Sequence, residues 1–350
     1  MTALGYWGHH TNLKALVYTA LRRLKLQDIP IPRMKPEEAL VKIRAVGVCG
    51  SDLHGFLGKS KKRIPPLILG HEFCGEVAEV GSRVSNIKPG ETVAVYPLIG
   101  CGHCRFCESQ RENLCPARRL YGLDFHGGLA EYVSAPAHCL FRLPAKLSFV
   151  EGSLVEPLAN AVHVVGKCGD LAGQTGMVVG AGPIGLCALW VAQQLGVGKI
   201  AVSDINPHRL ETLRHLGPDL IIDASKQDPV WAVVDWTQGQ GADFAIDAVG
   251  SSVCRRHTVD GTAIGGTAVW IGLEEDLCEI DARTVVTREV QIRGAYAYTK
   301  SDFARAISLL ETRTLPYNTF THTADFADGQ AIFEDLASGR SSITKAVFVL

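Results

Sequence analysis

The first part of the chain is a series of short apolar runs separated by turn residues. Runs of this kind, bounded by glycine, proline and charged residues, are typical of antiparallel strands in a barrel-like sheet. They lie at Leu16 to Tyr18, Ala39 to Val48, Gly75 to Val80, Thr92 to Val95 and Ala130 to Val133, all before Pro144. The pattern predicts a β-rich domain.

The pattern changes from residue 177 onward to alternating strands and helices. Buried strands are expected at Met177 to Val179, Ile200 to Ser203, Leu220 to Ile222, Phe244 to Ile246 and Ala268 to Ile271. Helical stretches fall between them at Gly185 to Leu195, Arg209 to Leu216 and Val230 to Trp236. Such alternating units predict a doubly wound parallel sheet.

The two patterns separate near residue 160 and meet again near residue 295. A helix over Asp302 to Leu310 and a strand over Ala346 to Leu350 follow, and this tail can return to the first domain. The predicted fold is α/β. One domain is expected from residues 13–160 and 296–350, and the other from residues 161–295.

Composition and charge narrow the function. The chain has 350 residues, enough for about two domains, and 47% of them are hydrophobic, enough for full cores. The 35 Lys and Arg against 36 Asp and Glu give a net charge of −1. Nucleic-acid binders normally carry a basic surplus. The composition predicts an enzyme with a small-molecule substrate and no nucleic-acid partner.

No segment predicts a membrane span. The most apolar stretch, Met177 to Ala192, is interrupted by glycines and a proline and is shorter than the roughly 20 residues that a bilayer requires. The amino terminus lacks the basic-then-apolar pattern of a signal peptide. We therefore expect a cytoplasmic protein without a membrane partner, in which the eleven cysteines stay reduced.

Four cysteines form the pattern C-x2-C-x2-C-x7-C: Cys101, Cys104, Cys107 and Cys115. Zn²⁺ favours four thiolates in a closed tetrahedral shell, and short spacings on turns bring the sulfurs to about 2.3 Å from one ion. Two disulfides are the alternative, but disulfides belong to oxidising compartments and mostly to small secreted chains. The pattern predicts a structural zinc lobe over residues 97–118.

A glycine-rich turn leaves the first strand of the second domain and enters a helix as G-x-G-x-x-G. Its residues are Gly180, Ala181, Gly182, Pro183, Ile184 and Gly185. The first glycine permits a tight turn, the second lets the backbone approach a pyrophosphate, and the third lets the helix pack on the strand. The helix amino terminus then faces the phosphates. The turn predicts a dinucleotide site.

Asp204 ends the second strand, about twenty residues beyond these glycines. A carboxylate there accepts hydrogen bonds from the adenosine ribose hydroxyls and repels a 2′-phosphate, so NAD is the expected cofactor. Arg209 keeps NADP open as the less favoured alternative. Helix capping ahead of Asn206 and Pro207 is the alternative role for Asp204.

A second set of possible metal ligands is scattered through the first domain: Cys49, His71, Glu72 and Glu156. A catalytic zinc needs about three protein ligands and an open position, which a cysteine, a histidine and a carboxylate provide. Spacing does not show that they converge. Cys49 as a small buried hydrophobe, His71 as a core histidine and Glu156 as a first-turn carboxylate are the alternatives.

These segments together resemble the zinc-dependent medium-chain alcohol dehydrogenase family. GVCGSDLH, GHEFCGEVAEVGSRV, the cysteine lobe, VEPLANAVH and GAGPIG occur in the family's order over nearly the whole chain. The resemblance implies a GroES-like catalytic domain around a Rossmann NAD domain. The Glu-Pro-Leu at 156 to 158 stands where liver-type enzymes carry a cysteine ligand, and is similar to the polyol, sorbitol and threonine dehydrogenase branch.

The resemblance also implies one catalytic and one structural zinc per chain. Cys49 and His71 would ligate the catalytic ion, with Glu72 and Glu156 binding it or holding its water. Ser51 and His54 resemble the family's proton relay; a helix cap and a solvated imidazole are the alternatives for these two. A homodimer or homotetramer, joined through Rossmann sheet edges, is implied as well.

The expected reaction is hydride transfer between a secondary alcohol or polyol, or the ketone in reverse, and NAD. Sorbitol dehydrogenases carry an arginine where this chain has Ala297, which argues against sorbitol itself. Three tyrosines are candidates to line the pocket: Tyr96, Tyr121 and Tyr296.

Three alternatives remain. A threonine-type amino alcohol is one substrate alternative. A hexitol phosphate is another, captured by the basic cluster of Lys59, Lys61, Lys62 and Arg63. A cofactor-sensing zinc protein without activity would be expected to lack one of the ligands implied above, and none is missing.

Overall fold

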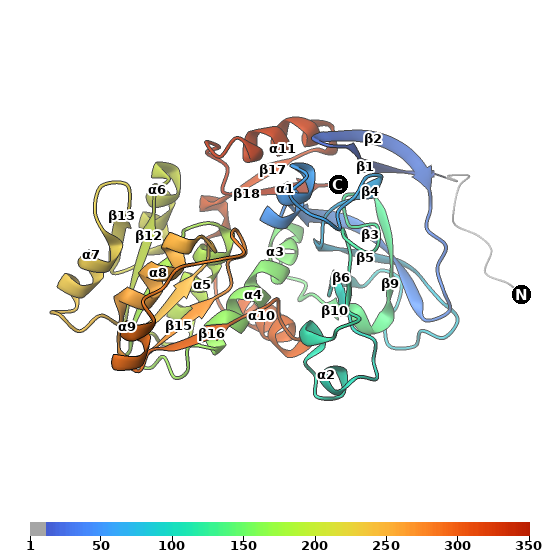
Figure 1. Ribbon diagram of the computed structural model, residues 1–350. Coiled ribbons are helices and arrows are strands. Elements are labelled where there is room, and N and C mark those ends of the chain that lie inside the picture. Colours follow the sequence, from blue (N-terminus) through green and yellow to red (C-terminus); the bar gives the residue numbers. More distant parts are fainter. Residues whose placement is uncertain (1–11) are drawn as a thin grey trace, which may run out of the picture.

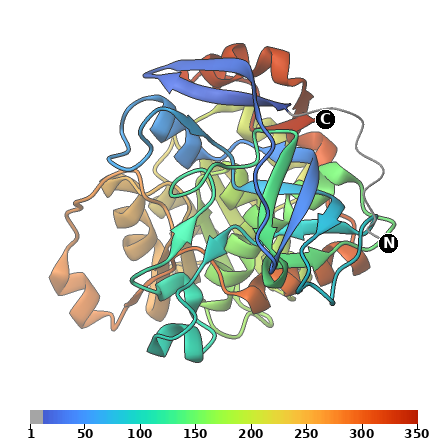
Figure 2. The same ribbon diagram turned by 90° about the vertical axis from the view of Figure 1, so that its right-hand side faces the viewer.

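The computed structural model describes residues 12–350, so the search for a signal peptide concerns a segment outside the described chain. Figures 1 and 2 show two bodies that meet along a central group of helices. One body is rich in strands and holds the carboxy terminus. The other is a parallel sheet covered by helices. The α/β character predicted from the sequence is confirmed.

The strand-rich body contains two main sheets. The first has the order β2-β1-β4, with β1 (Asn12–Ala20), β2 (Arg23–Pro30) and β4 (Leu67–Ile68). The second has the order β10-β6-β5-β3-β18-β17, and β9 also pairs with β3. Its strands are β3 (Glu38–Gly47), β5 (Glu72–Val80), β6 (Thr92–Val95), β9 (Tyr132–Pro136), β10 (Leu140–Arg142), β17 (Thr321–Ala324) and β18 (Lys345–Val349). Four of the five predicted runs fall on strands. For the fifth run, the strand β9 begins at Tyr132 instead of Ala130. Ala130 makes only an isolated bridge to Ala15.

Short elements complete this body. They are α1 (Gly50–Phe56), β7 (Leu98–Ile99), α2 (Arg105–Glu108), β8 (Arg119–Leu120), α3 (Phe149–Ser153) and α11 (Gly329–Ala337). The tail returns as predicted, because β18 pairs antiparallel with β3, the strand that precedes the first candidate ligand. The carboxy-terminal tail therefore shares a sheet with β3, although the two are far apart in the sequence.

The second body is a six-stranded sheet of order β13-β12-β11-β14-β15-β16 in which every pair is parallel. Its strands are β11 (Thr175–Val179), β12 (Lys199–Asp204), β13 (Leu220–Asp223), β14 (Ala242–Asp247), β15 (Thr262–Trp270) and β16 (Gln291–Gly294). Its helices are α5 (Pro183–Gln194), α6 (Pro207–Leu216), α7 (Pro229–Trp236), α8 (Ser252–Gly261) and α9 (Ala282–Thr287). The strands read as continuous apolar runs because helices cover both faces.

Local sequence explains where these helices begin and end. Proline occupies the first turn of α5, α6 and α7, where its missing N–H costs nothing. The Asn206 side chain accepts hydrogen bonds from the N–H groups of His208 and Arg209 and so caps α6. Gly217 ends the same helix with φ of 64°. The cap is therefore Asn206, not Asp204.

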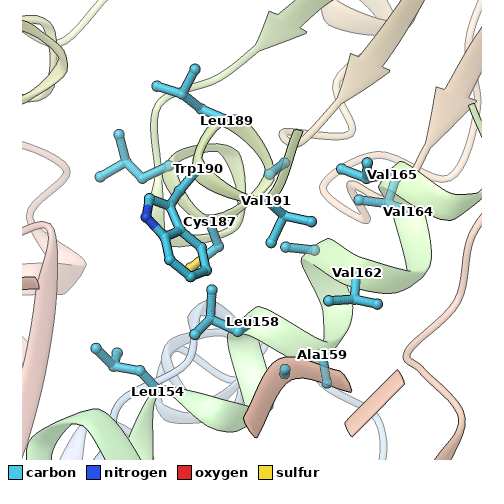
Figure 3. Packing of buried hydrophobic residues seen from close by; sticks show 14 of the residues in the cluster. Leu154, Leu158, Ala159, Val162, Val164, Val165, Cys187, Leu189, Trp190 and Val191 are labelled. Atoms are coloured by element: carbon cyan, nitrogen blue, oxygen red, sulfur yellow. The ribbon is translucent and has the colours of Figure 1, made fainter. Parts of the chain in front are cut away.

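The central helices are α4 (Val155–Gly166) and α10 (Lys300–Thr312), which join the two bodies. In Figure 3, side chains of α4 and α5 point toward one another, including Leu158, Val162, Cys187, Trp190 and Val191. This apolar cluster also reaches Ala45 and Cys74 in the strand-rich body. Because α4 is packed on both sides, it carries Glu156 on a rigid support.

Among residues 12–350, the structure contains no helix that is long and apolar enough to cross a membrane.

Candidate active site

Cys49, His71 and Glu72 converge at one edge of the strand-rich sheet. Gly47, the last residue of β3, pairs with Glu72, the first residue of β5. The chain that leaves β3 therefore passes the start of β5 when it reaches Cys49. The ligand atoms of these three residues all lie within 4.8 Å of one another. A thiolate, an imidazole and a carboxylate at such distances suit a divalent zinc ion.

Asp52 orients the imidazole of His71. Its Oδ1 lies 3.4 Å from Nδ1 of His71, and its Oδ2 accepts a hydrogen bond from the N–H of Cys49 at 3.1 Å. Burial alone would raise the pKa of Asp52, but the charges of His71 and Arg63 lower it to about 2. A carboxylate behind a histidine fixes the ring and leaves the other nitrogen for a metal. This arrangement fits zinc.

Negative charge surrounds His71. Burial disfavours its protonated form, yet Asp52 and Cys49 outweigh burial and raise the pKa of His71 well above its usual value. The same field that stabilises an imidazolium stabilises a metal cation.

Lys345 neutralises Glu72. The Nζ of Lys345 donates to the Glu72 carboxylate and, at 3.0 Å, to the carbonyl oxygen of Val48. Both charged side chains are almost fully buried. Sequence reasoning missed Lys345, although a lysine at the start of an apolar final strand was a usable signal. It arrives through β18, so the tail completes the site.

Glu156, on α4, lies close enough to His71 and Glu72 to interact with their charges. Its Oε1 accepts a hydrogen bond from the hydroxyl of Tyr298 at 2.7 Å, and both residues are buried. Burial, with the charge of Glu72 adding to it, raises the pKa of Glu156 to about 7. Glu156 does not belong to the group of ligand atoms that all lie within 4.8 Å. Tyr298 was not among the predicted site residues.

Ser51 and His54 lie on α1, next to the metal candidates. Ser51 Oγ accepts a hydrogen bond from Nη2 of Arg63 at 3.0 Å. Burial, followed by the charge of Lys59, lowers the pKa of His54. The alternative role of Ser51 as a helix cap is not seen, since Cys49 is the N-cap of α1.

Arg63 is separated from the basic cluster in which the sequence placed it. Its Nε donates to the carbonyl oxygen of Gly122 at 3.1 Å, and only 8% of the residue is exposed. Lys59, Lys61 and Lys62 are exposed. Arg63 is therefore not on the surface with the three lysines of the cluster.

The four predicted lobe cysteines also converge, with ligand atoms within 4.8 Å of one another. Sγ of Cys107 lies 4.0 Å from Sγ of Cys101 and 3.6 Å from that of Cys104. Four sulfurs about 2.3 Å from a tetrahedral ion lie about 3.8 Å apart. Hydrogen bonds, first from the backbone N–H of Cys107, lower the pKa of Cys104 to about 6, whereas burial raises the pKa of Cys107 to about 12, so of these two only Cys104 favours the thiolate without a metal. The cluster fits a structural zinc.

The glycine turn between β11 and α5 has the shape that its sequence predicts. Gly180 adopts φ of 99°, and a side chain on Gly185 would collide with the carbonyl oxygen of Gly180. The space around Gly182 is open: a Cβ atom at this position would have only Nη1 of Arg209 near it, at 3.9 Å. The turn, including Pro183 and Ile184 in the first helical turn, is open to a phosphate at its second glycine.

Asp204 lies beside this turn. Its carboxylate accepts hydrogen bonds from the N–H groups of Ala181 at 2.6 Å and Asn206 at 2.8 Å, and Nη1 of Arg209 lies 3.7 Å away.

A cavity of about 110 Å³ opens between the two bodies. It is lined by Gly50 and Leu53 of α1 and by Pro183 and Arg209 of the cofactor side. A larger groove of about 600 Å³ lies elsewhere on the strand-rich body, and none of Cys49, His71 and Glu72 lines it. The smaller cavity lies between the two neighbours of Cys49 in the chain, Val48 and Gly50, and the first helical residue after the glycine turn, Pro183.

Two of the three tyrosines expected in a substrate pocket are packed in cores. Tyr96 contacts Tyr298 and Phe303 edge to face, and Tyr121 packs on Phe73. Tyr296 is partly exposed and lines a third cavity with Asn113 and Leu273.

The comparisons with known proteins agree with this geometry. Residues 35–145 match the family model of the alcohol dehydrogenase GroES-like domain, and residues 183–312 match that of zinc-binding dehydrogenases. Sorbitol dehydrogenase of Bacillus subtilis (strain 168) is 33% identical over 82% of this chain and 83% of its own. The chain belongs to the zinc-binding alcohol dehydrogenase family. This dehydrogenase is thus an enzyme of the class that the sequence predicted.

Further relatives differ in substrate and cofactor. L-threonine 3-dehydrogenase of Bacillus velezensis (strain FZB42) is 33% identical over 90% of this chain and 92% of its own. A putative zinc-binding dehydrogenase from Sinorhizobium meliloti 1021, bound to NADP, has a TM-score of 0.90, 29% identity and coverage of 97% and 100%. A short chain alcohol dehydrogenase from E. coli CFT073, complexed with NADH, has a TM-score of 0.90, 26% identity and the same coverage. Zinc and a nicotinamide cofactor are therefore the cofactors of this dehydrogenase, as predicted.

Proposed function

We propose that this dehydrogenase transfers a hydride between a secondary alcohol or polyol and NAD, and reduces the ketone in reverse. The observation that carries the proposal is the convergence of Cys49, His71 and Glu72 beside a cavity that reaches the glycine turn. A hydride donor held at the metal site would lie next to a dinucleotide held at that turn. Zinc, when bound, supplies a Lewis acid that makes the substrate hydroxyl more acidic.

The proposed roles follow from the contacts. Cys49 and His71 hold the catalytic zinc. Glu72, already paired with Lys345, completes the ligand set without adding a full negative charge. Glu156, oriented by Tyr298, is the second carboxylate of the pocket and can hold a water or exchange for Glu72. The structural zinc is assigned to the four lobe cysteines.

Ser51 and His54 are proposed to carry the proton out. The guanidinium of Arg63 has only donors, so Ser51 Oγ must accept from it, which leaves the serine proton free to be donated elsewhere. His54 is only partly buried on the same helix and has a lowered pKa, so it can release a proton near neutral pH.

NAD is proposed over NADP. Asp204 carries a negative charge at the edge of the glycine turn, where a 2′-phosphate would be repelled. Arg209 offers a counter-charge 3.7 Å away, and a similar structure binds NADP, so NADP is the alternative cofactor.

Two residues narrow the substrate class. Ala297 in place of an arginine argues against sorbitol, and the burial of Arg63 argues against capture of a hexitol phosphate by the basic cluster. The 33% sequence identity to an L-threonine 3-dehydrogenase makes an amino alcohol the second candidate substrate. The test is reduction of NAD at 340 nm by metal-analysed enzyme over secondary alcohols, diols, free polyols, hexitol phosphates and threonine.

Assembly and location complete the proposal. We propose a homodimer or homotetramer formed through β16, an edge strand of its sheet; the connection from β15 to β16 exposes Leu273, Leu277 and Val286. A cytoplasmic location is supported by eleven free cysteines. The proposed domain limits are residues 13–160 and 296–350 for the GroES-like catalytic domain and 161–295 for the Rossmann domain.

A further inference from the structure

The four-cysteine lobe touches the segment that carries Tyr298. Asn113, just before Cys115 of the lobe, is only 3% exposed. Its Nδ2 donates a hydrogen bond of 2.8 Å to the carbonyl oxygen of Tyr296, which is 183 residues away in the chain. A buried amide that bonds one distant backbone carbonyl fixes the position of that carbonyl.

Two further contacts hold the same segment from the lobe. The guanidinium carbon of Arg118 lies 4.6 Å from the centre of the Tyr296 ring, and Nη1 of Arg118 donates to the carbonyl oxygen of Cys115 at 3.1 Å. Lys300 Nζ lies 3.9 Å from Oε1 of Glu112. The lobe therefore contacts both ends of the segment 296–300, at Tyr296 and at Lys300.

The held segment has an uncommon backbone and ends in the active site. Ala297 adopts φ of 49°, a left-handed conformation that residues with a Cβ adopt only when their surroundings impose it. The next residue is Tyr298, whose carbonyl oxygen accepts from the hydroxyl of Tyr96 at 3.2 Å and whose own hydroxyl donates to Glu156. Tyr296, which the lobe contacts, is thus only two residues from Tyr298, which contacts Glu156.

We propose that Asn113 is a positioning residue of the dehydrogenase, which holds Ala297 left-handed and thereby keeps Tyr298 against Glu156. If the amide of Asn113 is removed, Ala297 can relax toward negative φ, and the Tyr298 hydroxyl moves away from the carboxylate. The lobe then acts on turnover as well as on stability. This inference rests on the proposed function, in which Glu156 belongs to the catalytic pocket.

The experiment is a double-mutant cycle of Asn113→Ala and Tyr298→Phe. Each single variant is expected to lower kcat/KM about tenfold, the low end for residues that orient a metal pocket, with the loss in kcat and an unchanged KM for NAD. The double variant should be no slower than Tyr298→Phe alone, because both act through one contact. Losses that multiply, or an Asn113→Ala enzyme with full kcat, would overturn the proposal.

A matched control separates positioning from stability. Gln193→Ala removes another amide that donates to backbone carbonyls, those of Leu216 and Gly217, remote from the pocket. It is expected to lower the melting temperature without lowering kcat. If Asn113→Ala does not fold, Arg118→Ala replaces it in the cycle.

Hydrogen exchange provides a readout that does not need a substrate. In Asn113→Ala, the amides of residues 296–300 should exchange faster than in the wild type, while Gln193→Ala leaves them unchanged. Unaltered exchange would contradict the inference. Faster exchange in a protein whose wild type oxidises no alcohol would leave this contact in place and reject the proposed function instead.

Discussion

Lys345 and Glu72 form a buried ion pair between the last strand of the chain and the first residue of β5, with 1% and 2% of their side chains exposed. Desolvating two charges is costly, and the pair is maintained because Lys345 Nζ also reaches the carbonyl oxygen of Val48. The pair ties the carboxy-terminal tail to the metal candidates.

We expect Lys345→Ala to destabilise the metal-free protein by about 3–5 kcal/mol, since it leaves the Glu72 carboxylate buried without a partner. The measurement is urea unfolding in the presence of a chelator. Arg83→Ala is the control, because it breaks an exposed pair with Glu37 and should cost about 1 kcal/mol or less. Equal losses in the two variants would contradict the importance of the buried pair.

Asp204→Ala tests the cofactor assignment. The variant should lose about tenfold or more in affinity for NAD, because charge-assisted hydrogen bonds to the ribose are removed, and should lose much less for NADP. Fluorescence titration with NADH and NADPH measures both. An equal loss for the two cofactors would show that Asp204 only supports the turn through Ala181 and Asn206. Arg209→Ala is the matched variant, expected to weaken NADPH more than NADH.

Asp302 predicts a pH dependence of stability. Burial would raise its pKa, but hydrogen bonds from His163, at 2.8 Å, and from Thr299 lower it overall. A carboxyl whose pKa is lower in the folded state stabilises the fold above its unfolded pKa and loses this contribution as the pH falls through its folded pKa. The melting temperature of Asp302→Asn should therefore lie below that of the wild type at pH 7, and the difference should shrink below about pH 4.

The control for this prediction is Glu311→Gln, which changes an exposed carboxylate on the same helix. The difference in melting temperature between this variant and the wild type should be the same at every pH. A difference between Asp302→Asn and the wild type that stayed constant down to the acid transition would show that the charge of Asp302 contributes nothing and that only its hydrogen bonds to Thr299, the N-cap of α10, matter.

The parts of the fold that could be predicted are those encoded by local sequence. The glycine turn and the four-cysteine lobe lie within short windows, and the signals that start a helix, such as the N-cap Asn206 followed by Pro207, are local too. The parallel sheet followed from apolar runs because its strands are buried on both faces. Strands of mixed polarity, such as β2, with most residues exposed, carry no such signal.

The parts of the site that could not be predicted are contacts between distant segments. Lys345 meets Glu72 across 273 residues, and Tyr298 meets Glu156 across 142. Arg63 was grouped with its lysine neighbours because sequence shows adjacency, whereas the fold turns it inward to Ser51 and Gly122. Each of these partners is chosen by tertiary packing, which no local pattern reveals.

In the proposed mechanism Cys49, with His71 and a carboxylate, holds the zinc that activates the alcohol. The most direct measurement compares wild type and Cys49→Ala for zinc content, NADH binding and NAD reduction with the best alcohol of the panel. We predict two zincs per chain in the wild type, one in the variant, near-normal NADH binding and loss of turnover by at least about a thousandfold. A variant that keeps two zincs or measurable turnover would contradict the account.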